Sequence, residues 1–186
     1  MDISREEAVE LLKKYIKNEH LLYHSYASEA VMRALAKKLN KNENKWALAG
    51  LLHDIDVEIV NADPKKHGLK ACEILKEANI DPEIIDAIKM HNEEATGEKR
   101  NTVFQHALAA GETITGMITA ATLVYPDKKI KSLKPKSVIK RMKEKKFAAS
   151  VNRETIKECE KIGIPLNDFV IICVDAMKEI GEEIGL

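Results

Sequence analysis

A histidine and an aspartate stand side by side, as His53 and Asp54, at the end of a segment that is otherwise almost wholly apolar. A buried ionised carboxylate costs on the order of several kcal/mol unless a base, a helix N-terminus or a metal ion compensates it. Neighbouring helix positions point about 100° apart, yet an imidazole and a carboxylate there can both bend toward one ion. The pair alone leaves two interpretations open: metal ligands, or a core histidine hydrogen-bonded to an acid.

Three more histidines and one acid are placed where they could join the same site. His24 lies among apolar and small residues, His67 follows a turn signal, and His91 closes a predicted helix. For each of them alone, a satisfied core position or a surface position is an equally good interpretation. Glu112 is more informative, because it is the only charged residue within 103–126 and is therefore expected to point into a polar pocket.

The elements that must position these residues are helices. Aromatic residues make up only 4% of the chain, and Ala, Leu, Ile, Lys and Glu dominate, which favours helices over strands. We expect about seven helices in an all-α fold, with no alternating run long enough for a sheet. Capping signals and apolar spacing place the helices that carry the candidate residues at about 21–39, 45–55, 63–78, 82–91 and 102–124.

Length and composition predict one soluble domain. The 186 residues carry 30 basic and 30 acidic side chains and are 45% apolar, as in an ordinary globular protein. We expect a single domain over 1–186, with a metal-binding core at about 18–126 and a C-terminal extension at about 127–186 packed on it. That extension would contain helices that begin at Asn152 and Pro165.

The chain shows no sign of export or of a membrane. Its start is acidic and amphipathic, unlike a signal peptide, and its least charged stretch, 102–126, is too polar to span a bilayer. Cys72, Cys159 and Cys173 are odd in number and lack close pairing, which fits reduced core thiols. We therefore expect a cytoplasmic protein without a membrane partner.

A basic segment follows Pro126. Residues 127–146 contain ten Lys or Arg against two acids, a charge of 10 − 2 = +8. This positive charge suits a phosphorylated substrate, although a lysine-rich stretch can equally be a solvated face, and it lacks the interleaved aromatics of a nucleic-acid platform. Nucleic acid is therefore not the expected partner. Candidate substrate contacts are Lys136, Lys140, Lys146 and Arg153.

The ordered set His24, His53-Asp54, His67, His91 and a late acid resembles the metal-binding pattern of the HD-domain superfamily. The resemblance is closest to a prokaryotic group of predicted HD-superfamily hydrolases. It runs through NEHLLYH, WALAGLLHDID, KKHGLKACEIL, AIKMHN, ITGMITAATLVYP, FAASVNRE and the final helix. The family's late acid is usually aspartate, in a stretch like AADELTG, whereas this chain has AAGETITG and Glu112, whose extra methylene changes the reach to a metal.

The resemblance implies an HD-domain helical bundle with one or two divalent transition metal ions. His24, His53, Asp54 and Glu112 would hold one ion, and His67 and His91 would join a bridging Asp54 to hold a second. Imidazole with carboxylate suits Fe, Mn, Zn, Co or Ni.

The implied activity is hydrolysis of a small phosphorylated metabolite or nucleotide by a metal-activated water. Asp54 would be the catalytic residue, since it could accept the proton of the attacking water as well as bridge the metals. Two alternatives remain: an HD-type diiron oxygenase, or a catalytically weak module that binds metal or nucleotide. The sequence leaves the oligomeric state open.

Four further residues near or outside this pattern have modest roles. Asp56 and Lys89 lie close to ligands in the sequence and could orient them, although a paired or solvent-facing position is as good an interpretation. His20 and His106 fall outside the ligand pattern and are expected to be structural or exposed.

Overall fold

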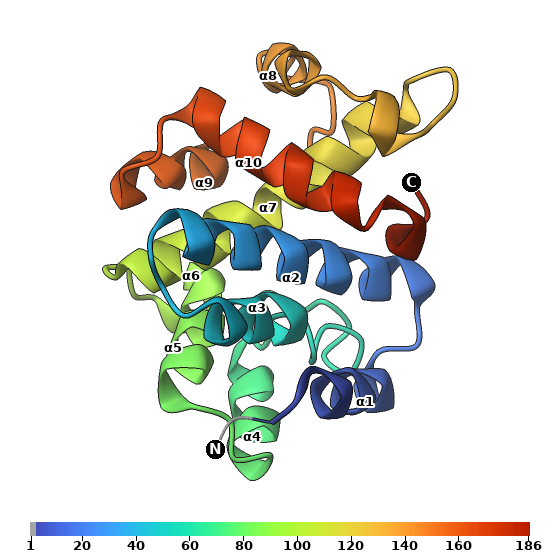
Figure 1. The fold of residues 1–186 in the computed structure, drawn as a ribbon. Helices are drawn as coiled ribbons and strands as arrows, with labels where there is room; N and C mark the ends of the chain where they lie inside the picture. The colour runs from blue at the N-terminus through green and yellow to red at the C-terminus, as the bar shows by residue number, and fades with distance from the viewer. Residues whose placement is uncertain (1–2) are drawn as a thin grey trace.

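Residues 3–186, the part of the chain that the computed structural model describes, contain ten α-helices, three short 3-10 helices and no strand (Figure 1). The all-α fold is confirmed. The helices outnumber the seven or so expected because short elements such as α6 and α8 fall in polar or basic stretches. The elements are α1 (Arg5–Tyr15), α2 (Glu19–Lys38), α3 (Glu43–Leu52), α4 (Leu69–Glu77), α5 (Pro82–His91), α6 (Glu93–Thr96), α7 (Val103–Leu123), η1 (Ile130–Ser132), α8 (Pro135–Met142), α9 (Arg153–Lys157), η2 (Glu158–Ile162), α10 (Leu166–Glu179) and η3 (Gly181–Ile184).

The long helix α2 runs through the middle of the molecule. It contacts α3, α7 and α10, and Figure 1 shows α10 on one side of it, α3 on the other and α7 crossing it. Val31, Met32 and Leu35 are fully buried along its length. Because α2 is enclosed in this way, a polar residue on it can face the interior.

Several helices begin at the predicted caps. The Asn42 side chain accepts from the backbone of α3, and Asp81 does the same for α5, where Pro82 follows. Thr102 and Gln105 form a capping box at the start of α7. These side chains satisfy backbone N–H groups that have no partner within the helix, and the predicted starts are confirmed.

The prediction of a helix that begins at Asp63-Pro64 and carries His67 is wrong. The chain between α3 and α4 is a run of turns, and α4 begins only at Leu69. Gly68 has a φ of +89°, which breaks the helical path just before α4. Asp63 therefore caps a single turn, with its carboxylate accepting from the Lys65 backbone.

Residues beyond 126 share the apolar core with the residues before it. Leu133, Val138 and Phe169 are fully buried in the same cluster as Leu35 and Leu108. The helix α10 lies along α2, and α8 packs on α7 and α10. The C-terminal segment thus covers the helices that carry part of the candidate site.

The three cysteines are buried and unpaired, as predicted. Burial raises the pKa of the Cys159 thiol to about 12, so this group stays a thiol. Among the described residues, none of the helices has the length and apolar character needed to cross a bilayer.

Candidate metal centre

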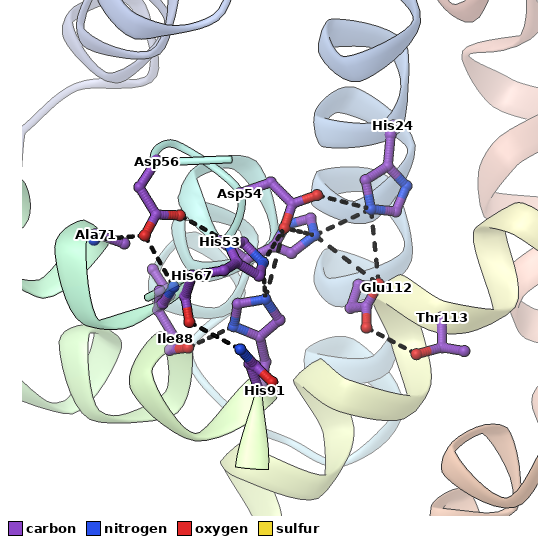
Figure 2. A network of polar contacts seen from close by, with 12 residues as sticks. His24, His53, Asp54, Asp56, His67, Ala71, Ile88, His91, Glu112 and Thr113 are labelled. Atoms are coloured by element: carbon purple, nitrogen blue, oxygen red, sulfur yellow. Dashed lines mark hydrogen bonds and ion pairs between the residues drawn. The ribbon is translucent and has the colours of Figure 1, made fainter. Parts of the chain in front are cut away.

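The fold brings all six predicted ligands together from five separate segments (Figure 2). One comes from α2, two from the turn after α3, one from the turn before α4, one from the end of α5 and one from the middle of α7. The ligand atoms form two groups, each with its atoms within 4.8 Å of one another. These groups are His24, His53 and Glu112, and Asp54, His67 and His91.

Asp54 lies between the two groups. Its Oδ1 is 3.0 Å from His67 Nε2 and 3.5 Å from His91 Nε2, and its Oδ2 is 3.5 Å from His24 Nε2. Oδ1 is also 3.3 Å from His53 Nε2, so the carboxylate contacts imidazoles of both groups. This is the arrangement that a bridging ligand needs.

Glu112 reaches the first group despite its departure from the family's aspartate. Its Oε2 is 3.6 Å from His24 Nε2 and 3.9 Å from His53 Nε2. The other oxygen, Oε1, accepts from the Thr113 hydroxyl at 2.7 Å. One carboxylate oxygen of Glu112 therefore faces the imidazoles, while the other is fixed by a hydrogen bond from Thr113.

In three of the four imidazoles, Nδ1 lies within hydrogen-bond distance of an oxygen that can only accept a hydrogen bond. His53 Nδ1 is 2.8 Å from the Gly50 carbonyl, and His91 Nδ1 is 2.5 Å from the Ile88 carbonyl. His67 Nδ1 is 2.7 Å from Asp56 Oδ1. Carbonyls and carboxylates have no proton to give, so Nδ1 is the donor in each case and Nε2 is left for a ligand bond.

The fourth imidazole, His24, is oriented by Thr115. The Thr115 hydroxyl donates to the Glu112 carbonyl at 2.7 Å, so it accepts from His24 Nδ1 at 2.9 Å. His24 Nε2 is thereby freed as well. Thr115 was not predicted from the sequence, because one threonine among several in α7 carries no distinguishing signal.

The four Nε2 atoms then face one another in pairs. His24 Nε2 lies 3.0 Å from His53 Nε2, and His67 Nε2 lies 2.9 Å from His91 Nε2. In neutral rings with the proton on Nδ1 these atoms carry lone pairs, which repel at this distance unless a cation lies beside them. Two ligands about 2.1 Å from one ion and at right angles to each other would be about 3.0 Å apart. The donor set therefore fits a metal in each group.

Without a metal ion, protons stabilise the same arrangement. Burial opposes the charged form of His67, but its bonds to Asp54 and Asp56 outweigh burial and raise its pKa to about 10. Burial likewise opposes a charged His53, yet the Asp54 and Glu112 carboxylates raise its pKa to about 8. Burial works against the charge of Asp54, but the surrounding imidazoles hold its pKa well below the ordinary value. The site attracts positive charge.

Asp56 is the group that fixes His67. It is fully buried, and besides His67 it accepts from the backbone N–H of Gly68 at 2.8 Å and of Ala71 at 2.9 Å. Its carboxylate also caps the first turn of α4. A carboxylate behind a ligating histidine fixes the ring's orientation and raises its basicity. Of the two interpretations of Asp56, the structure favours the orienting one.

A buried arginine holds the backbone at the other histidine of this group. Arg100 Nη1 donates to the carbonyls of Met90 and His91 at 3.1 and 3.2 Å. Its Nε and Nη2 donate to both oxygens of Glu158, which also accepts from His106 Nδ1 at 2.7 Å. The end of α5 is thus tied to η2 and α7. Arg100 and Glu158 were not predicted, because they stand far apart along the chain and neither matches a motif.

The other predicted residues lie away from the ligands. Lys89 is 3.9 Å from Glu98 at the surface, and His20 is exposed. The predicted substrate contacts Lys136 and Lys140 are exposed on α8, and Lys146 is exposed in the turn after it.

Arg153, the remaining candidate substrate contact, is engaged with the backbone. Its guanidinium donates to five carbonyls between Met142 and Val151, including those of Ala148 and Phe147. It therefore holds the turn that follows α8. A substrate contact from Arg153 stays a prediction and would require some of these bonds to break.

The candidate site is partly open to solvent. The side chains of His24 and Glu112 are 25% and 18% exposed and those of His67 and Asp54 16% and 14%, whereas His91 is 5% exposed and His53 is fully buried. Each group therefore has ligands that water can reach.

Comparison with known proteins points in the same direction. The sequence model of the HD domain matches residues 21–133. Ribonuclease Y of Lawsonia intracellularis is 25% identical over 169 residues, 89% of this chain but 32% of that protein, and Ribonuclease Y of Mycoplasma mycoides is 35% identical over 80 residues, 43% of this chain and 16% of that protein. The chain thus spans about a third or less of the relatives it matches. No solved structure matches it significantly.

Proposed function

The chain belongs to the HD domain family, and on that premise we propose that it is a metal-dependent phosphohydrolase that acts on a small phosphorylated metabolite or nucleotide. One observation carries the proposal. Four imidazoles have their Nδ1 atoms bonded within the protein and their Nε2 atoms paired at 2.9 and 3.0 Å around the Asp54 carboxylate. Nitrogen and carboxylate oxygen atoms arranged in this way are suited to bind cations.

The residues have separable tasks in this reaction. A bound divalent ion would lower the pKa of a water and polarise a phosphoryl oxygen. Asp54 contacts imidazoles of both groups and would be the carboxylate that accepts a proton from a water at the centre. Asp56 and Thr115 keep two of the rings in the orientation that leaves Nε2 free.

The donor set would suit a divalent transition metal. Imidazole nitrogens with carboxylate oxygens are ligands that Fe, Mn, Zn, Co and Ni accept. Such an ion would be held by His24, His53 and Glu112, or by Asp54, His67 and His91.

The names of the relatives support phosphoester chemistry over the oxygenase alternative. They are called ribonucleases, and a ribonuclease cleaves phosphoester bonds. We propose a small substrate for this chain, because ligand side chains that are at most 25% exposed suit a compact molecule. Nucleic acid stays outside the proposal.

The test is metal analysis of the purified protein, followed by a phosphatase screen over nucleotides and sugar phosphates with Mn, Fe, Co, Ni and Mg added back. We expect bound metal and metal-dependent release of phosphate. Asp54→Ala should lose metal and activity while remaining helical by circular dichroism. The matched control is Asp168→Ala, which removes an exposed aspartate outside the two ligand groups. Bound iron with oxygen-dependent turnover and no phosphate release would instead indicate the oxygenase.

A further inference from the structure

A cavity of about 370 Å³ lies beside the metal centre, between α2 and α7. We call it the α2–α7 cavity. Its size is at the lower end of the range of about 300–1,000 Å³ usual for small-molecule pockets. Its walls include His20, Tyr23, His24, Thr115, Thr119 and Leu123.

The cavity adjoins the metal centre through a ligand that both share. The His24 ring presents Nε2 to the other ligands, while the same ring lines the cavity together with Thr115, its partner at Nδ1. On α7, Gly116 lines the cavity one helical turn after Glu112, a rise of about 6 Å along the helix. A group attached to a phosphate at the centre is thus within reach of the cavity.

The chemistry of the walls excludes a second charged group. No lysine or arginine side chain lines the cavity, and its walls include Leu186 with its terminal carboxylate, so a further phosphate or a carboxylate meets no lysine or arginine there. The exposed lysines of 127–146 are not among its walls. A di- or triphosphate tail would have no cation to bind there.

The same walls offer few partners for hydroxyl groups. The Thr115 hydroxyl already has two hydrogen bonds within the protein, which leaves Thr119, Tyr23 and His20 as the main polar groups. Ala27, Gly116 and Ala120 provide room, and Leu123 and Ile184 provide apolar surface. A sugar would leave most of its hydroxyls unpaired, whereas an apolar group would gain from burial.

We propose that the α2–α7 cavity binds the uncharged, largely apolar organic group of a phosphate monoester whose phosphate lies at the metal centre. The proposal rests on the proposed function, since it assumes that a phosphoryl group is hydrolysed there. The cavity selects substrates by the apolar area that they bury, rather than by charge. Among phosphate esters, those with an apolar group are therefore hydrolysed faster than sugar phosphates and nucleoside triphosphates.

The test uses methyl, propyl and pentyl phosphate with the metal-loaded protein. Burying one methylene contributes about 0.8 kcal/mol, a factor of three to four, so kcat/KM should rise about three- to fourfold per added methylene until the cavity is filled. Methyl- and pentylphosphonate, which are not hydrolysed, serve as inhibitors and as ligands for calorimetry. Their dissociation constants should fall by the same factor per methylene, which gives a readout independent of turnover.

Variants assign the effect to this cavity. Thr119→Phe fills it, and Leu123→Ala, at a half-exposed position near the end of α7 where little packing is lost, removes an apolar wall. Both should reduce the pentyl-to-methyl ratio of kcat/KM at least severalfold. Val124→Phe places the same ring as Thr119→Phe at an exposed position outside the cavity and should leave the ratio unchanged.

The outcomes distinguish the two proposals. Hydrolysis of methyl phosphate with no gain from longer chains would overturn the cavity assignment and leave the hydrolase proposal standing. A gain that both cavity variants leave intact would also overturn the assignment. No hydrolysis of any ester and no binding of either phosphonate would overturn the proposed function, and the cavity assignment with it.

Discussion

Asp56 orients a ligand of the candidate metal centre without being a ligand itself. It receives the Nδ1 proton of His67 at 2.7 Å from a fully buried position. Replacing it with asparagine keeps the size but removes the charge, so the ring is less basic and its orientation is no longer fixed. Because Asp54, His67 and His91 form one group, the ion held by that group should suffer most.

We expect Asp56→Asn to weaken the binding of one Mn²⁺ about 10- to 100-fold, the usual effect of removing such a partner. Calorimetric titration of metal-free protein measures it, with the other ion as an internal reference. Asp63→Asn is the matched control, because the Asp63 carboxylate caps a turn in the same segment and contacts Lys65 and Lys66 rather than a ligand side chain. Equal affinities in Asp56→Asn and wild type would contradict the orienting role.

The protons on the ligand histidines give a second prediction. In the metal-free protein the pKa of His67 is raised to about 10 and that of His53 to about 8, so both rings are mostly charged at pH 7 and only His67 at pH 9. Since a metal needs the free Nε2, binding releases these protons. Loading should release about two protons at pH 7 and about one at pH 9, and affinity should rise with pH.

Calorimetry in buffers of different ionisation enthalpy counts the released protons. The control is His20→Asn, which removes an exposed histidine outside the two ligand groups and should leave the proton count unchanged. A release that does not change between pH 7 and pH 9 would show that His53 does not exchange its proton for the metal.

Residue types and their order in the sequence predicted the ligands, but not the residues that hydrogen-bond to the ligands. The sequence singles out Glu112 as an isolated charge in an apolar helix, and the structure places it 3.6 Å from His24. Thr115 and Arg100 act through hydrogen bonds across the fold. Nothing in their local sequence differs from a surface residue of the same type, so only the structure identifies them.

At the scale of elements, the centre depends on how closely α3 approaches α2. A Cβ added to Gly50 would lie 2.4 Å from the Ser28 carbonyl oxygen of α2, so only glycine permits this crossing. The Gly50 carbonyl also accepts from His53 Nδ1. Moving α3 outward would therefore move His53 away from His24.

Gly50→Ala should lower the free energy of unfolding by about 1–3 kcal/mol, as overpacking usually does, and should weaken metal binding. Urea denaturation and calorimetry measure the two effects. Gly116→Ala is the matched control for stability: its added Cβ would meet only Val151, at 3.4 Å, and alanine favours a helix over glycine. A Gly50→Ala protein as stable as wild type would contradict the packing argument.

The end of α5 is the second element on which the centre depends. Arg100 joins the carbonyls of Met90 and His91 to Glu158 of η2. Arg100→Met keeps much of the apolar stem and removes these bonds, so His91 loses its fixed backbone and one ion should bind about tenfold more weakly. Arg141→Met, which removes a half-exposed arginine paired with Glu144, should leave both affinities unchanged in the same titration.

Helix starts were predictable where a side chain caps the backbone, as at Asp81 and Thr102. The start at Asp63 failed because Gly68, with its positive φ, interrupts the chain five residues later. A cap followed by proline opens a turn as readily as a helix, and only the tertiary contacts of the segment decide between them. Here Asp56 binds both His67 and the first turn of α4.

At the scale of the whole molecule, the question is whether the metal-binding helices and the C-terminal segment unfold together. The ligands come from segments between His24 and Glu112, while Phe169 and Val138 belong to the same buried cluster as Leu35. A shared core predicts one cooperative transition over both parts. Two separate domains would give two transitions, of which a metal would shift only one.

We therefore expect a single thermal transition that Mn²⁺ moves as a whole. An ion at 100 times its dissociation constant adds about 2.7 kcal/mol of stability, which for a chain of this size raises Tm by roughly 5–10 °C. Calorimetry gives the number of transitions, and a chelator should return Tm to the metal-free value. The tryptophan fluorescence of Trp46 on α3 reports the metal-binding part. In a Cys72→Ala variant, the exposure of the buried thiols of Cys159 and Cys173 reports the C-terminal part. If the two probes melted at different temperatures, with only the first responding to Mn²⁺, the C-terminal segment would be an independent unit rather than part of the domain that holds the metal.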